Sequence, residues 1–287
     1  MLDNSTEMYY SLNKSKSVLK KGGTMKAGIF YFSGTGNTFR VAEVFGNYLK
    51  QLGYNIDYID VAKKNQTIDD YELLVFGSPT YSKVASQKVV DFIKNFEFND
   101  LSNTKAITFI THSWGEAYGH IVMADELSNK GIEVISSLAL LMPNNHYALT
   151  GKRNNDEEMT KMYKEVVSRI HLVINSVDTG PKIFDQRGKV KKSAFKQLNK
   201  ILRKKWIPNY GTNYLTINDD ICVGCNLCVQ KCPTQNIVSS VSKIEMLDKC
   251  LACVKCYNAC PVNAFLVNGK QIRPYTENQI SIHERLD

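Results

Sequence analysis

Two stretches of this sequence share one pattern: residues 222–233 read CVGCNLCVQKCP, and residues 250–261 read CLACVKCYNACP. Both follow the spacing C-x-x-C-x-x-C-x-x-x-C-P, and the second begins 28 residues after the first, so they form an internal repeat. Together they contain all 8 cysteines of the 287-residue chain. The repeat predicts a small cysteine-ligated unit in the C-terminal part of the chain.

Cysteines at this spacing suit an iron–sulfur cubane. Three thiolates separated by two residues can wrap a tight turn around one face of a cluster, with backbone N–H groups pointing at its sulfurs. Structural zinc sites usually use pairs of C-x-x-C, which would leave the cysteines before Pro233 and Pro261 without a role. Disulfides are disfavoured because we expect no secretory signal and find no other cysteine. The pattern therefore favours two [4Fe-4S] clusters.

Residues 212–272 resemble the bacterial two-cluster ferredoxins, in which the fourth cysteine of each run binds the other cluster. By this resemblance, one cluster is held by Cys222, Cys225, Cys228 and Cys260, and the other by Cys250, Cys253, Cys256 and Cys232. The sequence departs from the family at Asn236, where a small apolar residue is usual. We expect this change to affect packing more than ligation.

Composition indicates a globular protein of about two domains. Hydrophobic residues make up 43% of the chain, but an apolar stretch such as Val134–Met142 is far shorter than the roughly 20 residues of a membrane helix. We therefore expect no membrane span. The N-terminal residues include lysines but no apolar run typical of a secretory signal, so we expect a reducing, cytoplasmic location, which suits thiolate-bound clusters.

The net charge of +8 is concentrated in one segment, because residues 187–205 contain nine basic side chains and no acidic one. Apolar residues recur there at helical spacing, at Phe195, Leu198, Ile201, Leu202 and Trp206. We interpret the segment as a basic amphipathic helix whose charges face solvent; alternatively, it docks an acidic redox partner. No recognisable DNA-binding motif accompanies it, so we do not expect a nucleic-acid partner.

Residues 1–24 are polar and aperiodic, and we assign them no fold. The sequence Lys21-Gly22-Gly23-Thr24 before Met25 is what a purine-rich ribosome-binding site would encode if translated. We therefore expect Met25 to be the true start.

From residue 26 the chain alternates between strand and helix patterns, which predicts a parallel, doubly wound α/β sheet. The expected strands are Ala27–Phe32, Tyr54–Ile59, Leu73–Gly77, Ala106–Ile110 and Ile132–Leu141. The expected helices are Phe39–Leu52, Val84–Phe96, Ile121–Asn129 and Glu157–Ile174. The residues Ser176–Pro181 end this domain.

The first strand leads through residues 33–38, SGTGNT, into a helix, and this arrangement forms an anion site at the helix N-terminus. A triphosphate-binding loop would need G-K-[ST], which is absent here. A dinucleotide loop would need a third glycine where Phe39 stands, although Asp60 lies near the position of a ribose-binding acid. The remaining candidate is a mononucleotide phosphate held by hydroxyls and main-chain N–H groups.

These residues resemble the phosphate loop of flavodoxins, [ST]-x-T-G-N-T, and the resemblance covers about residues 25–176. It implies strand order 2-1-3-4-5 and FMN bound at the carboxyl ends of the strands. Two further loops fall where that geometry needs them, at Ser78–Tyr81 and Thr111–Gly119. The FMN-binding candidates are Ser33, Gly34, Thr35, Gly36, Asn37, Thr38, Ser78, Pro79, Thr80, Tyr81, Thr111, Trp114 and Gly115.

By the same resemblance, aromatic residues in these loops sandwich the flavin ring. Tyr81 and Trp114 are the candidates, with Tyr118 as a substitute, although each could also be an ordinary loop-packing residue. The loop Pro143–Tyr147 opens on the same side and either lines a substrate pocket or caps the next segment. His112 and His146 are the histidines we consider as proton donors. Catalytic residues cannot be assigned beyond this.

The expected domains are a leader at 1–24, a flavodoxin-like domain at 25–180, a basic linker at 181–211, a ferredoxin domain at 212–272 and a tail at 273–287. Within the ferredoxin domain we expect a strand at Tyr214–Ile217 and a small hairpin from Asn236–Val238 and Lys243–Met246. A further strand, Phe265–Val267, precedes the turn Asn268-Gly269.

This combination resembles the flavodoxin–ferredoxin fusion proteins of anaerobic bacteria. The resemblance implies an electron-transfer protein in which two clusters exchange electrons with FMN, and FMN with a redox partner protein. The alternative is a reductase in which FMN acts directly on a small-molecule acceptor. Linking the two domains raises the effective concentration of cluster near flavin without any new contact.

Overall fold

The computed structural model describes residues 25–63, 68–81, 83–97, 103–115, 117–146, 153–178, 180–185, 214–240, 243–271, 274–275, 282 and 286. The expected leader at 1–24 and the expected basic helix at 187–206 lie outside these residues. Among the described helices, none combines the length and the apolar character that a bilayer crossing requires.

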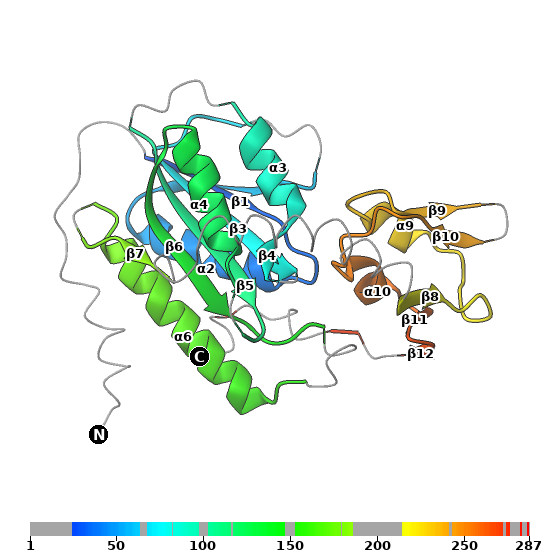
Figure 1. The fold of residues 1–287 in the computed structure, drawn as a ribbon. Coiled ribbons are helices and arrows are strands. Elements are labelled where there is room, and N and C mark those ends of the chain that lie inside the picture. The colour runs from blue at the N-terminus through cyan, green and yellow to red at the C-terminus, as the bar shows by residue number, and fades with distance from the viewer. Residues whose placement is uncertain are drawn as a thin grey trace.

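A parallel sheet forms the N-terminal domain, in the order β2-β1-β3-β5-β6-β7 (Figure 1). Its strands are β1 (Lys26–Tyr31), β2 (Asn55–Asp60), β3 (Leu73–Tyr81), β5 (Lys105–His112), β6 (Glu133–Leu141) and β7 (Ile183–Phe184). The central strands are buried on both faces, because their apolar runs are covered by helices on both sides. The predicted order 2-1-3-4-5 is confirmed by the first five of these strands.

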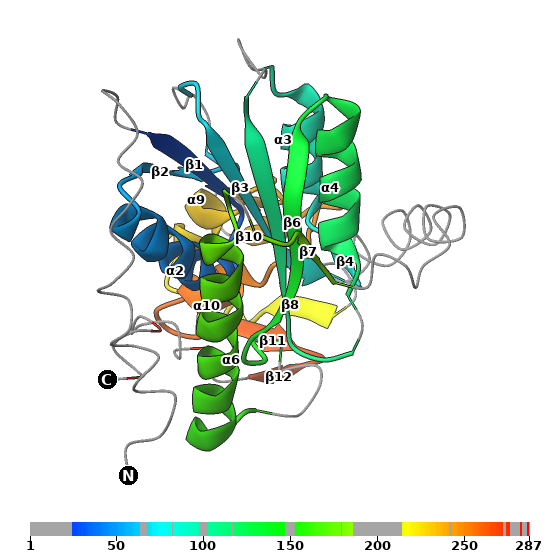
Figure 2. The ribbon, with the colours of Figure 1, turned by 90° about the vertical axis from the view of Figure 1, so that its left-hand side faces the viewer.

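Helices cover both faces of the sheet, as Figure 2 shows. On one face α2 (Asn37–Gln51) and α6 (Asp156–Asn175) pack around buried residues such as Phe45 and Tyr163. On the other, α3 (Gln87–Asn95) and α4 (Gly119–Asn129) pack around residues such as Val89 and Met123. The doubly wound arrangement leaves the carboxyl ends of the strands, with their loops, along one edge.

The second expected flavin loop is part of a hairpin. β3 runs on to Tyr81, and β4 (Val84–Ala85) pairs antiparallel with its end. We predicted a helix from Val84, but α3 begins at Gln87. Val84 is fully buried and pairs with Tyr81 of β3. These contacts favour a strand there, although the spacing of apolar residues had predicted a helix.

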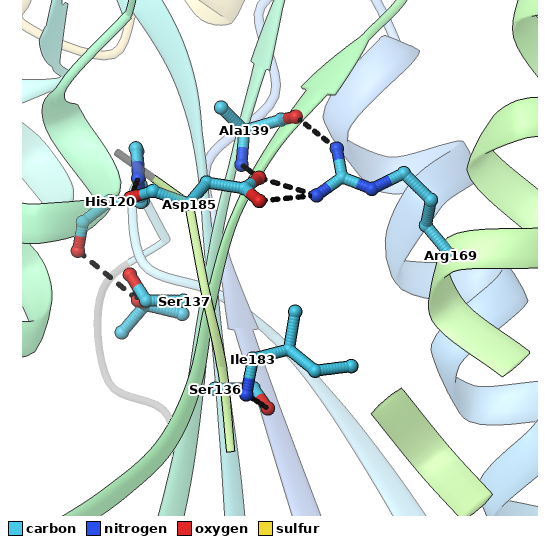
Figure 3. Close-up of polar contacts among 8 residues, drawn as sticks. His120, Ser136, Ser137, Ala139, Arg169, Ile183 and Asp185 are labelled. Atoms are coloured by element: carbon cyan, nitrogen blue, oxygen red, sulfur yellow. Dashed lines mark hydrogen bonds and ion pairs between the residues drawn. The ribbon is translucent and has the colours of Figure 1, made fainter. Parts of the chain in front are cut away.

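The sheet takes in β7, which lies beyond the boundary expected at residue 180. Figure 3 shows how polar contacts hold this edge. Asp185 accepts hydrogen bonds from Arg169 at 2.6 Å and from the Ala139 backbone N–H at 2.8 Å, while Arg169 also donates to the Ala139 carbonyl at 2.8 Å. Two side chains therefore satisfy the β6 backbone where its pairing with β7 stops.

The C-terminal unit consists of short elements gathered beside the α/β domain (Figure 1). They are β8 (Leu215–Ile217), α9 (Leu227–Lys231), β9 (Ile237–Ser239), β10 (Ile244–Met246), α10 (Lys255–Ala259), β11 (Phe265–Val267) and β12 (Lys270–Gln271). β9 and β10 form the expected hairpin, and β8, β11 and β12 form a small antiparallel sheet. The sequence repeat is a structural repeat, since α9 and α10 each span five residues and each follow a left-handed N-cap, at Asn226 and Val254.

The C-terminal end of the chain returns to the first domain. Tyr275 is 4% exposed, and Ile282 is 1% exposed within the core that α2 and α6 share. We expected an extended polar tail here, and the sequence carries little local signal because Ile280, Ile282 and Leu286 are isolated from one another by polar residues.

Candidate functional site

The candidate phosphate loop lies at the start of α2. Gly36 is the N-cap, at φ 101°, a conformation that favours glycine. It has no side chain to cap the helix, but the Ser33 hydroxyl accepts from the Gly36 N–H at 3.0 Å and from the Phe39 N–H at 3.4 Å. Ser33 thus satisfies part of the first turn, and the N–H groups of Asn37 and Thr38 remain as candidate donors to an anion. The local geometry fits a phosphate group.

Neighbouring strand ends hold this loop in place. Thr38 shares a hydroxyl–hydroxyl hydrogen bond of 2.9 Å with Thr111, at the end of β5. The Asn37 amide donates to the carbonyl of Pro143, after β6, at 2.8 Å, and Asn145 donates to the Thr35 hydroxyl. The loop after β6, which the sequence placed on the flavin side, thus contacts the phosphate loop directly.

The residues of the second loop, Ser78–Tyr81, differ in how far they are exposed to solvent. Ser78 is fully buried, and its hydroxyl accepts from the Ser86 N–H at 2.8 Å, which ties β3 to the start of α3. Pro79 and Thr80 are partly exposed in the hairpin. Tyr81 is 8% exposed and packs in the α3–α4 core together with Cys253. The second loop therefore lies beneath the C-terminal unit.

In the third loop, Trp114 is 71% exposed and Gly115 has φ 66°. The two aromatic candidates thus lie in opposite environments, Tyr81 in a domain contact and Trp114 in solvent. An exposed tryptophan is available to cover a planar ligand or to meet another molecule. Tyr118 is the N-cap residue of α4, and its backbone N–H donates to the carbonyl of Lys83 at 3.0 Å.

Both candidate proton-donating histidines are neutral at pH 7. Burial lowers the pKa of His146 to about 4 and also lowers the pKa of His112. The His146 ring centre lies 6.3 Å from that of Tyr81. A neutral imidazole can still donate one N–H, so these side chains can orient a ligand, but neither carries a ready positive charge.

Four cysteines line one cavity in the C-terminal unit: Cys232, Cys250, Cys253 and Cys256. We call them the inner set. Burial, together with the charges of Cys250 and Cys232, raises the pKa of the Cys253 thiol to about 12. Burial, followed by the charges of Cys253 and Cys250, also raises the pKa of Cys256. Thiolates crowded in this way need a cationic group among them, which the iron ions of a cluster provide.

The other four cysteines, Cys222, Cys225, Cys228 and Cys260, are the outer set. Burial raises the pKa of Cys228, and the charges of Cys225 and Cys222 contribute, so these three lie near one another. Cys225 is exposed and Cys260 is partly buried. The outer set is therefore nearer to solvent than the inner set.

Backbone N–H groups point at cysteine sulfurs in both copies of the repeat. The N–H of Asn236 donates to Cys232 Sγ and the N–H of Ala264 to Cys260 Sγ, each at 3.2 Å. The N–H of Ala252 donates to Cys250 Sγ at 3.3 Å. Such bonds stabilise thiolate ligands, so the donor pattern fits an iron–sulfur cluster.

The two candidate sites adjoin. A Cβ atom placed on Gly34 would lie 2.4 Å from the carbonyl oxygen of Cys253 and 3.1 Å from the Tyr81 hydroxyl oxygen. The backbone of an inner-set cysteine therefore rests directly on the phosphate loop. Only glycine permits this approach.

Sequence reasoning missed the residues that join the domains. The Tyr275 hydroxyl donates to Asn37 Oδ1 at 2.8 Å, and the Tyr275 N–H donates to Asn258 Oδ1 at 2.6 Å. Asn258 also donates to the carbonyl of Val254, between two inner-set cysteines, at 2.8 Å. Asn37 was a candidate from its loop motif, but no local pattern marks Tyr275 or the role of Asn258, because their partners lie far away in the sequence.

Comparisons with known protein families match two parts of the chain. A flavodoxin domain model matches residues 28–148, and a 4Fe-4S dicluster domain model matches residues 214–261. A comparison with curated proteins found no match.

Solved flavodoxins resemble the N-terminal part of the chain. A flavodoxin from the domain Archaea is 18% identical, with TM-score 0.35, over 53% of this chain and 99% of that one. A Fusobacterium nucleatum flavodoxin variant bound to flavin mononucleotide is 19% identical, with TM-score 0.40, over 54% and 99%. Megasphaera elsdenii flavodoxin is 20% identical, with TM-score 0.35, over 50% and 98%.

A doubly wound domain with a phosphate loop, joined to a cysteine-rich repeat unit, defines a two-domain redox protein of the flavin and iron–sulfur class. The chain is a fusion of a flavodoxin domain with a ferredoxin-type 4Fe-4S dicluster domain. The flavodoxin domain implies FMN, and the dicluster domain implies iron–sulfur clusters.

Proposed function

We propose that this protein transfers electrons between two [4Fe-4S] clusters and FMN, and onward to a redox partner protein. When bound, the clusters supply one-electron steps and FMN supplies one- or two-electron steps. The inner set would hold one cluster and the outer set the other, with Cys260 and Cys232 exchanged between the repeats. The cavity lined by the four inner-set cysteines supports this assignment.

The FMN phosphate would be held at the start of α2. Gly34 and Asn37 would present main-chain N–H groups there, Ser33, Thr35 and Thr38 would present hydroxyls, and Gly36 would supply the turn. Support comes from the left-handed Gly36 at the helix start and from the hydrogen bonds that fix this loop to β5 and β6. Tyr81, whose hydroxyl lies beside Gly34, and exposed Trp114 would cover the two sides of the flavin.

One observation carries the proposal: the Cys253 carbonyl lies against Gly34 of the phosphate loop. Close approach of inner-set ligands to the flavin loops permits transfer within one molecule. Exposure of Cys225, in the outer set, suits exchange with a separate protein. These observations therefore support electron transfer along the order outer cluster, inner cluster and flavin, in either direction.

The basic segment at residues 187–205 supports a partner with an acidic surface, since opposite charges speed encounter. Salt should then slow electron exchange with that partner. A reducing, cytoplasmic location is part of the same proposal because exposed thiolate ligands persist in such a compartment.

Cofactor content tests the proposal first. Anaerobic reconstitution with iron and sulfide, in the presence of FMN, should give a brown protein that carries two clusters and one flavin per chain. Acid release should return FMN. If the protein instead binds zinc and no flavin, both the cofactor assignment and the proposed electron transfer are wrong.

A second candidate function is direct reduction of a small molecule. A cavity of about 960 Å³ beside the third loop favours it, since that volume suits an organic ligand. Its lining includes His112, Trp114, Leu141, Lys161, Met162 and Arg169. If the reduced protein is reoxidised by a small acceptor with saturation, the reductase function holds; if only another protein reoxidises it, the carrier function holds.

A further inference from the structure

Asn236 lies in the wall of the inner-set cavity. It follows Cys232 by four positions, is 1% exposed, and lines the cavity together with all four inner-set cysteines. A carboxamide so deeply buried needs hydrogen-bond partners for both its oxygen and its nitrogen.

The orientation of the amide is fixed by one contact. Asn236 Oδ1 accepts a hydrogen bond of 2.5 Å from the backbone N–H of Lys249. Because a backbone N–H can only donate, the atom facing it is the oxygen, and Nδ2 points elsewhere. Nδ2 is buried and has no hydrogen-bond partner among the residues that the structure describes. Leaving a buried N–H donor unpaired is costly, so this group indicates an acceptor that is not part of the polypeptide.

The second half of the repeat provides an internal comparison. The position 28 residues after Asn236 is Ala264, which has no side-chain donor. In both halves the backbone N–H of this residue donates to a cysteine sulfur at 3.2 Å. The two cluster environments therefore share a backbone donor at this position and differ in its side chain, which is a carboxamide beside the inner set and a methyl group beside the outer set.

We propose that Asn236 Nδ2 donates a hydrogen bond to a sulfur of the inner cluster and raises its reduction potential. A hydrogen-bond donor stabilises the more negative, reduced state of a cluster more than the oxidised state. This inference rests on the proposed function only in that the inner set holds a [4Fe-4S] cluster. A raised potential would keep the electron on the cluster whose ligand Cys253 lies against the phosphate loop.

Redox titration of the full-length, reconstituted protein, followed by EPR, tests the inference. Asn236→Ala converts the position to the residue of the other repeat and retains the backbone donor. One of the two cluster midpoint potentials should become more negative, while the other, reporting the Ala264 environment, should stay unchanged. Iron and sulfide content should remain that of two clusters. Two unchanged potentials would overturn the inference.

A measurement on the wild-type protein tests the Asn236 hydrogen bond without any substitution. Protein made with asparagine labelled at its side-chain nitrogen with ¹⁵N should show a nitrogen coupling in pulsed EPR of the reduced inner cluster. Absence of that coupling would overturn the inference, even if Asn236→Ala changes a potential through the lost contact with Lys249. Failure of the wild-type protein to assemble any cluster would instead refute the proposed function.

Discussion

The Tyr275 hydroxyl donates a hydrogen bond of 2.8 Å to the Asn37 side chain, although the two residues are 238 positions apart. Asn37 belongs to the phosphate loop, and Tyr275 follows the cysteine repeat. Through Asn258, Tyr275 is also joined to the backbone between Cys253 and Cys256. A chain of buried and partly buried hydrogen bonds thus connects the inner set to the candidate flavin site.

Removal of the Tyr275 hydroxyl should weaken FMN binding. In Tyr275→Phe the buried Asn37 oxygen loses its donor, and we expect the dissociation constant for FMN to rise about tenfold. Fluorescence titration of FMN measures this. Tyr214→Phe, at a side chain that is 44% exposed, is the matched control and should bind FMN as the wild type does. Equal affinities in the two variants would show that the contact does not support the loop.

A side chain at Gly34 should disturb the contact between the domains. In Gly34→Ala the new Cβ would lie 2.4 Å from the Cys253 carbonyl oxygen, so the inner set must move away from the phosphate loop. We expect slower electron transfer from cluster to flavin in stopped-flow absorbance, with unchanged iron content. Gly53→Ala adds its carbon where no atom lies within 4 Å; its positive φ of 88° should lower stability, but electron transfer should keep the wild-type rate.

Acid should destabilise the fold through His146. Burial holds its folded-state pKa at about 4, against 6.5 as the ordinary value, so the unfolded chain binds more protons between these pH values. Stability should therefore be complete above pH 6.5 and fall as the pH drops toward 4, by on the order of 2 kcal/mol from this group. Urea unfolding of wild type and His146→Gln at several pH values measures the difference. If acid lowers the free energy of unfolding equally in the two proteins, His146 is not the cause of the loss.

The Arg169–Asp185 ion pair should stabilise the sheet edge more than an exposed pair does. Arg169→Ala removes hydrogen bonds to Asp185 and to the Ala139 carbonyl, and we expect a loss of about 2 kcal/mol in the free energy of unfolding. Lys182→Ala breaks an exposed ion pair with Glu133 in the same region and should cost less than about 0.5 kcal/mol. Similar losses in the free energy of unfolding would show that the contacts drawn in Figure 3 stabilise the fold no more than an exposed ion pair does.

Local sequence patterns predicted most of the secondary structure, including the strand, turn and helix that form the candidate phosphate loop. The run Ser33–Thr38 could be recognised because strand, glycine-rich turn and helix follow one another directly in the chain. Tyr81 could be named as an aromatic candidate, but its burial against Cys253 depends on a contact between distant segments. Val84 was assigned to a helix because its pairing with β3 is not visible in a helical spacing pattern.

The contacts between the domains lay beyond sequence reasoning. Tyr275 lies in a polar segment without periodicity. Asn258 lies within the second cysteine motif and Asn145 within the loop after the fifth expected strand, but both occupy positions that the patterns leave variable. Asn236 was noted as a departure from the ferredoxin pattern, but its role was expected to be packing. Only its fixed amide orientation and its place in the cysteine-lined cavity indicate a chemical role.

The most direct test of the account is the concentration dependence of flavin reduction in the fully loaded protein. Clusters are reduced anaerobically with a limiting one-electron donor, and flavin absorbance is followed over a wide range of protein dilution. Contact between the inner set and the phosphate loop predicts a first-order rate that does not change on dilution. A rate that falls in proportion to protein concentration would mean that electrons pass between molecules, and would contradict the account.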